Sequence, residues 1–214
     1  MQARRLTGLV LGAVLAASAC GSPTSTQHAT HSPASATQQP SGTPTPGIDA
    51  QVQGALQLRI EAAPKLPGET IPSAPDYETR TDYVDYQDGP GSARSLKDAG
   101  MQGAAVQHLI VDGGRALRVV LALGSHEAAC AMSDLRTGAQ FTLRERAVPG
   151  VPCARVHTIT DPAGTTLAHN ITFAVGRYAY LVGDVRRSDD LATAARRWYA
   201  AVKATGADLP GQAT

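Results

Sequence analysis

The three cysteines, Cys20, Cys130 and Cys153, are the side chains of this chain best suited to covalent chemistry. A thiol can be lipidated, can pair with a second thiol in a disulfide, or can bind a metal as a thiolate. Cys20 lies far from the other two. Its chemistry therefore depends on the N-terminal segment, whereas Cys130 and Cys153 can act together.

The segment before Cys20 has the three parts of an export signal. Arg4 and Arg5 form a positive start, Leu6 to Ala16 is an apolar run of 11 residues, and small residues precede the cysteine. A helix that spans a bilayer needs about 20 apolar residues. The pattern thus favours a cleaved signal over a permanent membrane span.

The residues Ala17-Ser18-Ala19-Cys20, followed by Gly21-Ser22, resemble the lipobox of secreted bacterial lipoproteins. The resemblance implies that residues 1–19 are a signal peptide and that Cys20 is lipidated before cleavage. That family more often has Leu where this chain has Ala17. Few lysines among many arginines and alanines resemble actinobacterial composition. The expected location is the extracytoplasmic face of the cell membrane, held by several acyl chains. Simple secretion, retention inside the cell, and a general or twin-arginine route remain alternatives.

Residues 21–47 contain no charged side chain and no aliphatic side chain larger than that of Ala. Such a Ser/Thr/Pro-rich segment cannot bury enough apolar area to offset the entropy of ordering. We therefore expect residues 20–47 to be a lipidated, disordered tether, residues 48–208 to form a single domain, and residues 209–214 to be a disordered tail. His28 and His31 lie in the tether and are expected to be solvated.

The charge of the mature chain is close to neutral. Removing Arg4 and Arg5 from the 19 basic residues leaves 17, against 18 acidic residues. No basic block supplies the field that a phosphate backbone needs, so nucleic acid is not an expected partner.

Cys130 and Cys153 are the only cysteines left once Cys20 is lipidated. An even pair in an exported protein predicts a disulfide. We expect Cys130 on the flank or outer side of its helix, with residues 148–152 folded over it. Two reduced thiols are the alternative, and a catalytic cysteine is disfavoured because no motif places a histidine beside it.

Four histidines belong to the domain: His108, His126, His157 and His169. A two-residue loop would pair His157 with Ala168 and put His157 and His169 on opposite faces of a sheet. A loop longer by one residue would pair the two histidines directly, without an evident third ligand. We predict that His157 and His169 are ordinary strand histidines, and we expect no metal site and no cofactor.

Periodicity and turn residues predict an α+β domain. It is a largely antiparallel sheet of six to seven strands with two to four helices packed on it. This order resembles small secreted actinobacterial lipoprotein domains. Residues 67–75 read as a loop and 89–91 as a turn. The expected helices cover residues 50–62, 92–99, 125–137 and 188–206. The expected strands cover residues 79–87, 103–111, 115–123, 140–146, 154–160, 165–175 and 178–185.

Several details of these elements can be checked. Asp82, Asp85 and Asp88 are expected on a solvated edge strand rather than in a cation site. The strand 115–123 has apolar residues on both faces, so it should be central and covered on both sides. The apolar stripe of helix 125–137 is expected at Ala128, Ala131, Met132 and Leu135. That of the last helix is expected at Leu191, Ala194, Ala195, Trp198 and Val202.

No hydrolase elbow, zinc-protease, phosphate-loop or Cys-x-x-Cys motif occurs in the chain. Arg186, Arg187, Arg196 and Arg197 are read as a solvated helix face. The favoured hypothesis is a membrane-anchored, non-catalytic binding or interaction module with an unidentified envelope partner. The alternatives are a carrier or sensor of a small apolar or envelope ligand in a sheet–helix cavity, and an enzyme without a recognisable motif. The ligand-binding residues cannot be named from the sequence.

Overall fold

The computed structural model describes residues 44–87, 90–132, 141–185 and 190–205. Cys20, the expected signal peptide, most of the expected tether and the expected tail lie outside these residues. No helix of the described part is long and apolar enough to cross a membrane. Its helices are α1 (Ala50–Glu61), α2 (Arg80–Gln87), α3 (Pro90–Asp98), α4 (His126–Met132) and α5 (Leu191–Ala204). Its strands are β1 (Glu69–Thr70), β2 (Asp76–Glu78), β3 (Gly103–Val111), β4 (Gly114–Ala122), β5 (Thr142–Ala147), β6 (Arg155–Thr160), β7 (Thr166–Val175) and β8 (Tyr178–Val185).

The eight strands form one antiparallel sheet in the order β1-β3-β4-β8-β7-β6-β5, and β2 pairs with a different part of β3 than β1 does. This confirms the predicted α+β class. The hairpin of β3 and β4 turns at Asp112 and Gly113, which both have positive φ, as a tight hairpin turn requires. The meander of β6, β7 and β8 is also confirmed.

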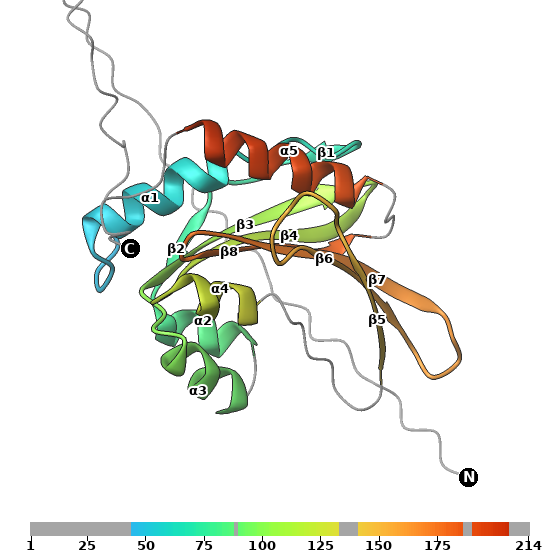
Figure 1. Ribbon diagram of the computed structural model, residues 1–214, viewed down its shortest axis with the longest axis horizontal. Helices are drawn as coiled ribbons and strands as arrows, with labels where there is room; N and C mark the ends of the chain where they lie inside the picture. Colours follow the sequence, from blue (N-terminus) through green and yellow to red (C-terminus); the bar gives the residue numbers. More distant parts are fainter. Residues whose placement is uncertain (1–43, 88–89, 133–140, 186–189, 206–214) are drawn as a thin grey trace, which may run out of the picture. The chain divides into compact units, whose positions relative to one another are not determined.

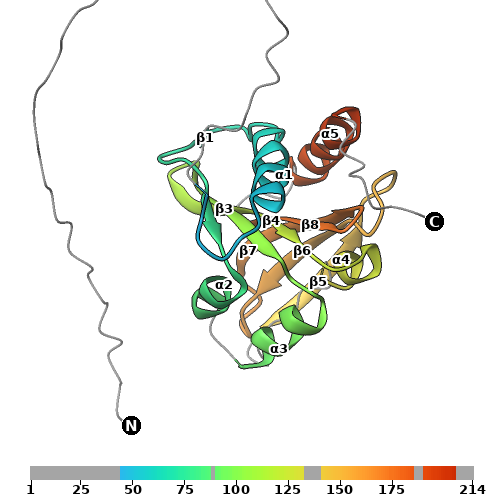
Figure 2. The ribbon, with the colours of Figure 1, turned by 90° about the vertical axis from the view of Figure 1, so that its left-hand side faces the viewer.

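Helices cover both faces of the sheet. Figures 1 and 2 show α1 and α5 on one face and α2, α3 and α4 on the other. In β4, Val120 and Ala122 join the core under α1 and α5, whereas Leu117, Val119 and Leu121 join the core on the opposite face. The prediction that this strand is central and covered on both sides is therefore confirmed.

The helix α1 begins as its sequence predicts, whereas the predicted start of the last helix at Ser188 lies outside the described residues. Asp49 caps α1, because its carboxylate accepts hydrogen bonds from the amides of Gln51 and Val52. The five predicted stripe residues of α5 are all buried. Trp198 packs edge-on against Phe173 and Tyr180, which stack on each other with ring centroids 4.5 Å apart.

The predicted strand over 79–87 is wrong, because this segment forms α2. The Thr79 hydroxyl accepts a hydrogen bond from the Asp82 amide, and the Asp82 carboxylate accepts from the Thr79 amide and hydroxyl. This reciprocal capping box starts a helix and outweighs the β propensity of the residues after it. Asp82 and Asp85 therefore lie on a helix, and not on an edge strand as was predicted. Asp88 lies outside the described residues.

Three smaller expectations are also corrected. Pro90 begins α3 rather than completing a turn, since proline suits the first position of a helix. The expected loop 67–75 contains β1, and β2 follows it; both pair with the edge of β3. In α4 the fully buried residue is Ala129, whereas the predicted stripe residue Ala131 is exposed. Residues 133–140, which include Leu135, are not described.

Candidate functional site

Three groups of polar or reactive side chains gather in the described part of the domain. The first surrounds the Cys130–Cys153 disulfide, the second lies on one face of β5, β6 and β7, and the third surrounds Arg118. They differ in exposure and in what their atoms can do.

Cys130 and Cys153 form a disulfide whose Cα atoms are 5.4 Å apart. Cys130 lies on α4, which Ser125 caps by accepting a hydrogen bond from the Ala128 amide. Cys153 lies in the loop between β5 and β6 and has a positive φ of 55°. Both cysteines are half-buried and pack against the second core, which agrees with the flank position expected for Cys130.

His126 adds an imidazole to this disulfide. It precedes Cys130 by one helical turn, so the two side chains share a face of α4. Its Nδ1 lies 2.9 Å from the carbonyl oxygen of Gly176, and its Nε2 lies 3.6 Å from the Sγ of Cys130. A carbonyl can only accept a hydrogen bond, so Nδ1 carries the proton. In the neutral imidazole, the lone pair of Nε2 then points toward the sulfur.

The second group contains buried polar side chains on the face of the sheet that elsewhere forms the second core. His157 is fully buried, and Asn170 and Thr172 are nearly so. The Nε2 of His157 lies 2.9 Å from the Thr172 hydroxyl, and its Nδ1 lies 3.4 Å from a carboxylate oxygen of Glu145. Glu145 also lies 3.6 Å from a guanidinium nitrogen of Arg155.

The order carboxylate, imidazole, hydroxyl is the order of the groups in a nucleophilic triad. Thr172, however, lies inside β7 and is 3 % exposed, so a substrate carbonyl cannot reach its hydroxyl in this structure. The arrangement holds three neighbouring strands together through polar contacts. It does not present a nucleophile.

The register of β6 and β7 differs from both that were considered. His157 pairs with Asn170, and Thr158 pairs with His169, because the turn is longer and an irregularity near Thr160 shifts the pairing. Asp161 closes that turn by accepting from the Thr165 amide. The two histidines lie on opposite faces, and the Nδ1 of His169 lies 3.1 Å from the Thr158 hydroxyl. They do not form a two-ligand site.

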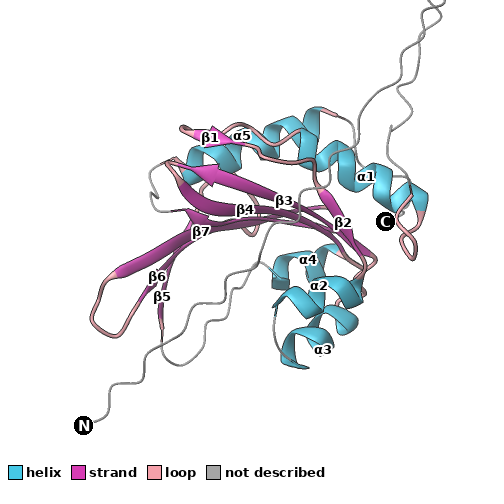
Figure 3. Ribbon diagram, turned by 180° about the vertical axis from the view of Figure 1, so that it is seen from behind, coloured by secondary structure: helices cyan, strands magenta, loops and turns pink. Residues whose placement is uncertain are grey.

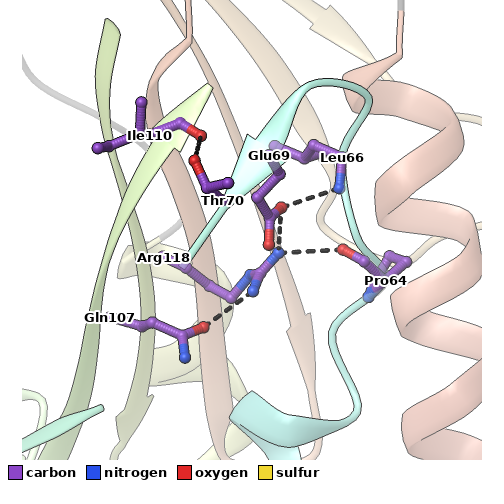
Figure 4. A network of polar contacts seen from close by, with 7 residues as sticks. All are labelled: Pro64, Leu66, Glu69, Thr70, Gln107, Ile110 and Arg118. Atoms are coloured by element: carbon purple, nitrogen blue, oxygen red, sulfur yellow. Dashed lines mark hydrogen bonds and ion pairs between the residues drawn. The ribbon is translucent and has the colours of Figure 1, made fainter. Parts of the chain in front are cut away.

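The third group is the buried network of Arg118, shown in Figure 4. Its guanidinium donates to the Gln107 side chain at 2.9 Å, to the Glu69 carboxylate at 2.9 Å and to the carbonyl of Pro64 at 3.0 Å. Glu69 also accepts from the Leu66 amide. Burial lowers the pKa of Arg118, and the negative Glu69 opposes that shift. The network fastens β1 and the segment before it to the sheet.

The strand β5 has exposed side chains on both of its faces, unlike the neighbouring strand β6. Side chains alternate between the faces of a strand. Arg144 and Arg146 on one face, and Glu145 and Ala147 on the other, are all exposed. Figures 1 and 3 show the ends of β5, β6 and β7 projecting beyond the helices. Phe141 is 37 % exposed at the start of this strand, and Leu167 is 48 % exposed in β7.

The other residues singled out in the sequence lie apart from these three groups. Arg196 and Arg197 are exposed on α5, as a solvated face requires, while Arg186 and Arg187 lie outside the described residues. His108 is exposed on β3. The sequence analysis did not predict that His126 contacts the disulfide. The one sequence signal for this contact was the four-residue spacing between His126 and Cys130 on a predicted helix.

No family model matches the chain, and no curated protein matches it. Among solved structures, the extracellular domain of PknH from Mycobacterium tuberculosis is similar at 10 % identity and a TM-score of 0.38. The match covers 65 % of this chain and 84 % of that one. No residue role passes from one protein to the other at this level of likeness.

Proposed function

We propose that this chain is a lipoprotein anchored through Cys20 on the extracytoplasmic face of the cell membrane, and that its domain is a non-catalytic binding module. The lipobox-like residues before Cys20 support the anchor. The observation that supports the binding role is that β5 has exposed side chains on both of its faces.

The edge of β5 is suited to pair with an extended segment of another protein. Among the described residues β5 pairs only with β6, so its outer backbone groups face away from the sheet. Exposed edges of this kind bind added strands, with the backbone supplying affinity and alternate side chains supplying selectivity. The strand carries charges of both signs, at Arg144, Glu145 and Arg146. Two copies of β5 would pair well only in a register that places opposite charges together, so these charges discourage pairing of β5 with itself in other registers.

The binding role is tested by charge reversal on β5. The double variant R144E/R146E should lose a protein that the wild-type chain retains from a solubilised envelope fraction, because the exposed side chains that select the partner are inverted. The matched control is R115E/R197E, which makes the same change of charge at exposed positions on β4 and α5. If both variants retain the partner protein equally well, β5 is not part of the binding surface. Co-purification of a stoichiometric small lipid instead would support the carrier alternative.

The anchor is tested by the intact mass of chain extracted from membranes. The proposal expects a mature chain that begins at Cys20 and carries acyl mass, and a C20S variant that no longer partitions into detergent. A membrane-derived chain that begins at Cys20 without acyl mass would reject the anchor while leaving the binding role of β5 open.

A further inference from the structure

We propose that His126, Cys130 and Cys153 form a redox-controlled metal site: closed while the disulfide exists, and open to one thiophilic d¹⁰ cation such as Zn²⁺ when the two cysteines are thiols. The proposal is independent of the anchor and of the binding surface on β5.

The three ligand atoms are already gathered. A ring nitrogen of His126 and the two Sγ atoms lie within 4.8 Å of one another. In tetrahedral zinc sites, Zn–S distances of about 2.3 Å and Zn–N distances of about 2.0–2.1 Å place sulfur and nitrogen about 3.5 Å apart. The Nε2 of His126 lies 3.6 Å from the Sγ of Cys130, so this pair needs almost no movement to bind one cation.

His126 is oriented as a metal-binding histidine is. Histidine ligands typically donate their second ring N–H to a carboxylate or a backbone carbonyl, which fixes the tautomer and the ring. Here Nδ1 donates to the carbonyl of Gly176 at 2.9 Å. Gly176 lies in the turn between β7 and β8, so the ring is held by an element other than its own helix. A histidine that only filled space beside a disulfide would not need this second contact.

The sulfur atoms must separate for the site to open. Sulfur atoms about 2.05 Å apart in a disulfide lie about 3.8 Å apart when both bind one tetrahedral zinc. Cys153 can supply this movement because it lies in the loop 148–154 rather than in a strand. The Val148 amide donates a hydrogen bond to the Ala154 carbonyl and closes the base of that loop, so its tip can shift without breaking the pairing of β5 and β6.

Opening the site requires reduction of the disulfide. A small-molecule thiol reductant attacks one sulfur of the disulfide, and a second thiol releases the mixed disulfide, so two electrons and two protons reach Cys130 and Cys153. The cation then replaces the two thiol protons and takes the lone pair of His126 as its third ligand. A water molecule can fill the fourth position, as in zinc sites with three protein ligands.

The test uses the full mature chain in its oxidised and reduced forms. A phosphine reduces the disulfide and is removed without oxygen; Zn²⁺ is then titrated against a chromophoric chelator, and bound metal is counted. We expect one equivalent in the reduced chain and none in the oxidised chain. The variant H126Q should bind at least about 100-fold more weakly, since loss of even an outer-shell partner typically costs 10- to 100-fold. The control H169Q should bind as the wild type does.

A second readout separates a folded site from binding by an unfolded cysteine pair. Co²⁺ in a tetrahedral site with two thiolates gives intense visible absorption, and Zn²⁺ bound to the folded dithiol form should raise its melting temperature. Equal zinc affinity in H126Q and the wild type would overturn the proposal. So would a reduced chain, folded or not, that binds no stoichiometric Zn²⁺. A parallel titration with Cu⁺ shows which d¹⁰ cation the site prefers.

Discussion

Arg118 and Glu69 form an ion pair at 2.9 Å with side chains that are only 3 % and 0 % exposed. Such a pair is costly to bury, and removing one partner leaves the other charge uncompensated. The contacts of Arg118 with Gln107 and Pro64 satisfy further donors of its guanidinium. The pair therefore sets how β1 and the segment after α1 dock on the sheet.

Replacing Glu69 with Gln should lower the free energy of unfolding by about 3–5 kcal/mol, because Arg118 then stays buried without a counter-charge. Urea denaturation followed by the fluorescence of Trp198, the single tryptophan, measures this. The control R155Q removes the partly exposed Arg155–Glu145 pair and should cost less than about 1 kcal/mol. A cost below 1 kcal/mol for E69Q would show that the buried pair does not hold this part of the fold.

The double variant C130S/C153S should be less stable than the oxidised wild type by about 3 kcal/mol, because the disulfide closes a loop across 23 residues of sequence and restricts the unfolded chain. Domains of this size usually have about 5–15 kcal/mol of stability, so the variant should still fold. Reduction of the wild type without metal should give the same loss. Identical urea midpoints for the oxidised and reduced chains would contradict the stabilising role of the disulfide.

The variant E78Q should be more stable than the wild type at pH 7 and equally stable near pH 4. Burial raises the pKa of Glu78, and the negative Asp76 and Asp82 raise it further. A raised pKa means that the folded chain holds this proton more tightly than the unfolded chain does. The associated stability is thus present below the unfolded pKa of about 4.3 and is lost as the pH rises through the folded pKa. Melting temperatures at both pH values measure the effect, and a lower melting temperature for E78Q at pH 7 would refute it.

The parts of the fold that could be predicted are those in which local pattern and burial agree. The bounds of β3 and β8 and the buried stripe of α5 follow directly from apolar periodicity. The secondary-structure prediction failed where a local helix cap or a strand distant in sequence determines the structure. Thr79 and Asp82 start α2 within residues of high β propensity, and β1 and β2 exist because the edge of β3 lies beside them.

The candidate sites show the same division. Counting cysteines in a chain that is expected to be exported was enough to pair Cys130 with Cys153. The contact between His126 and the disulfide was not predictable, because the carbonyl that orients the ring belongs to Gly176, 50 residues further along the chain. The contact of His157 with Thr172 depends on a register that a strand irregularity sets. Neither the orientation nor the irregularity has a signature in residue spacing.

Site-specific photocrosslinking in intact cells tests the proposed binding role most directly. A photoreactive residue at position 144 on β5 is compared with one at Leu58, which is 59 % exposed on α1. The proposal expects position 144 to give one discrete crosslinked protein and position 58 to give none or only diffuse products. A discrete crosslink from position 58 together with none from position 144 would contradict it.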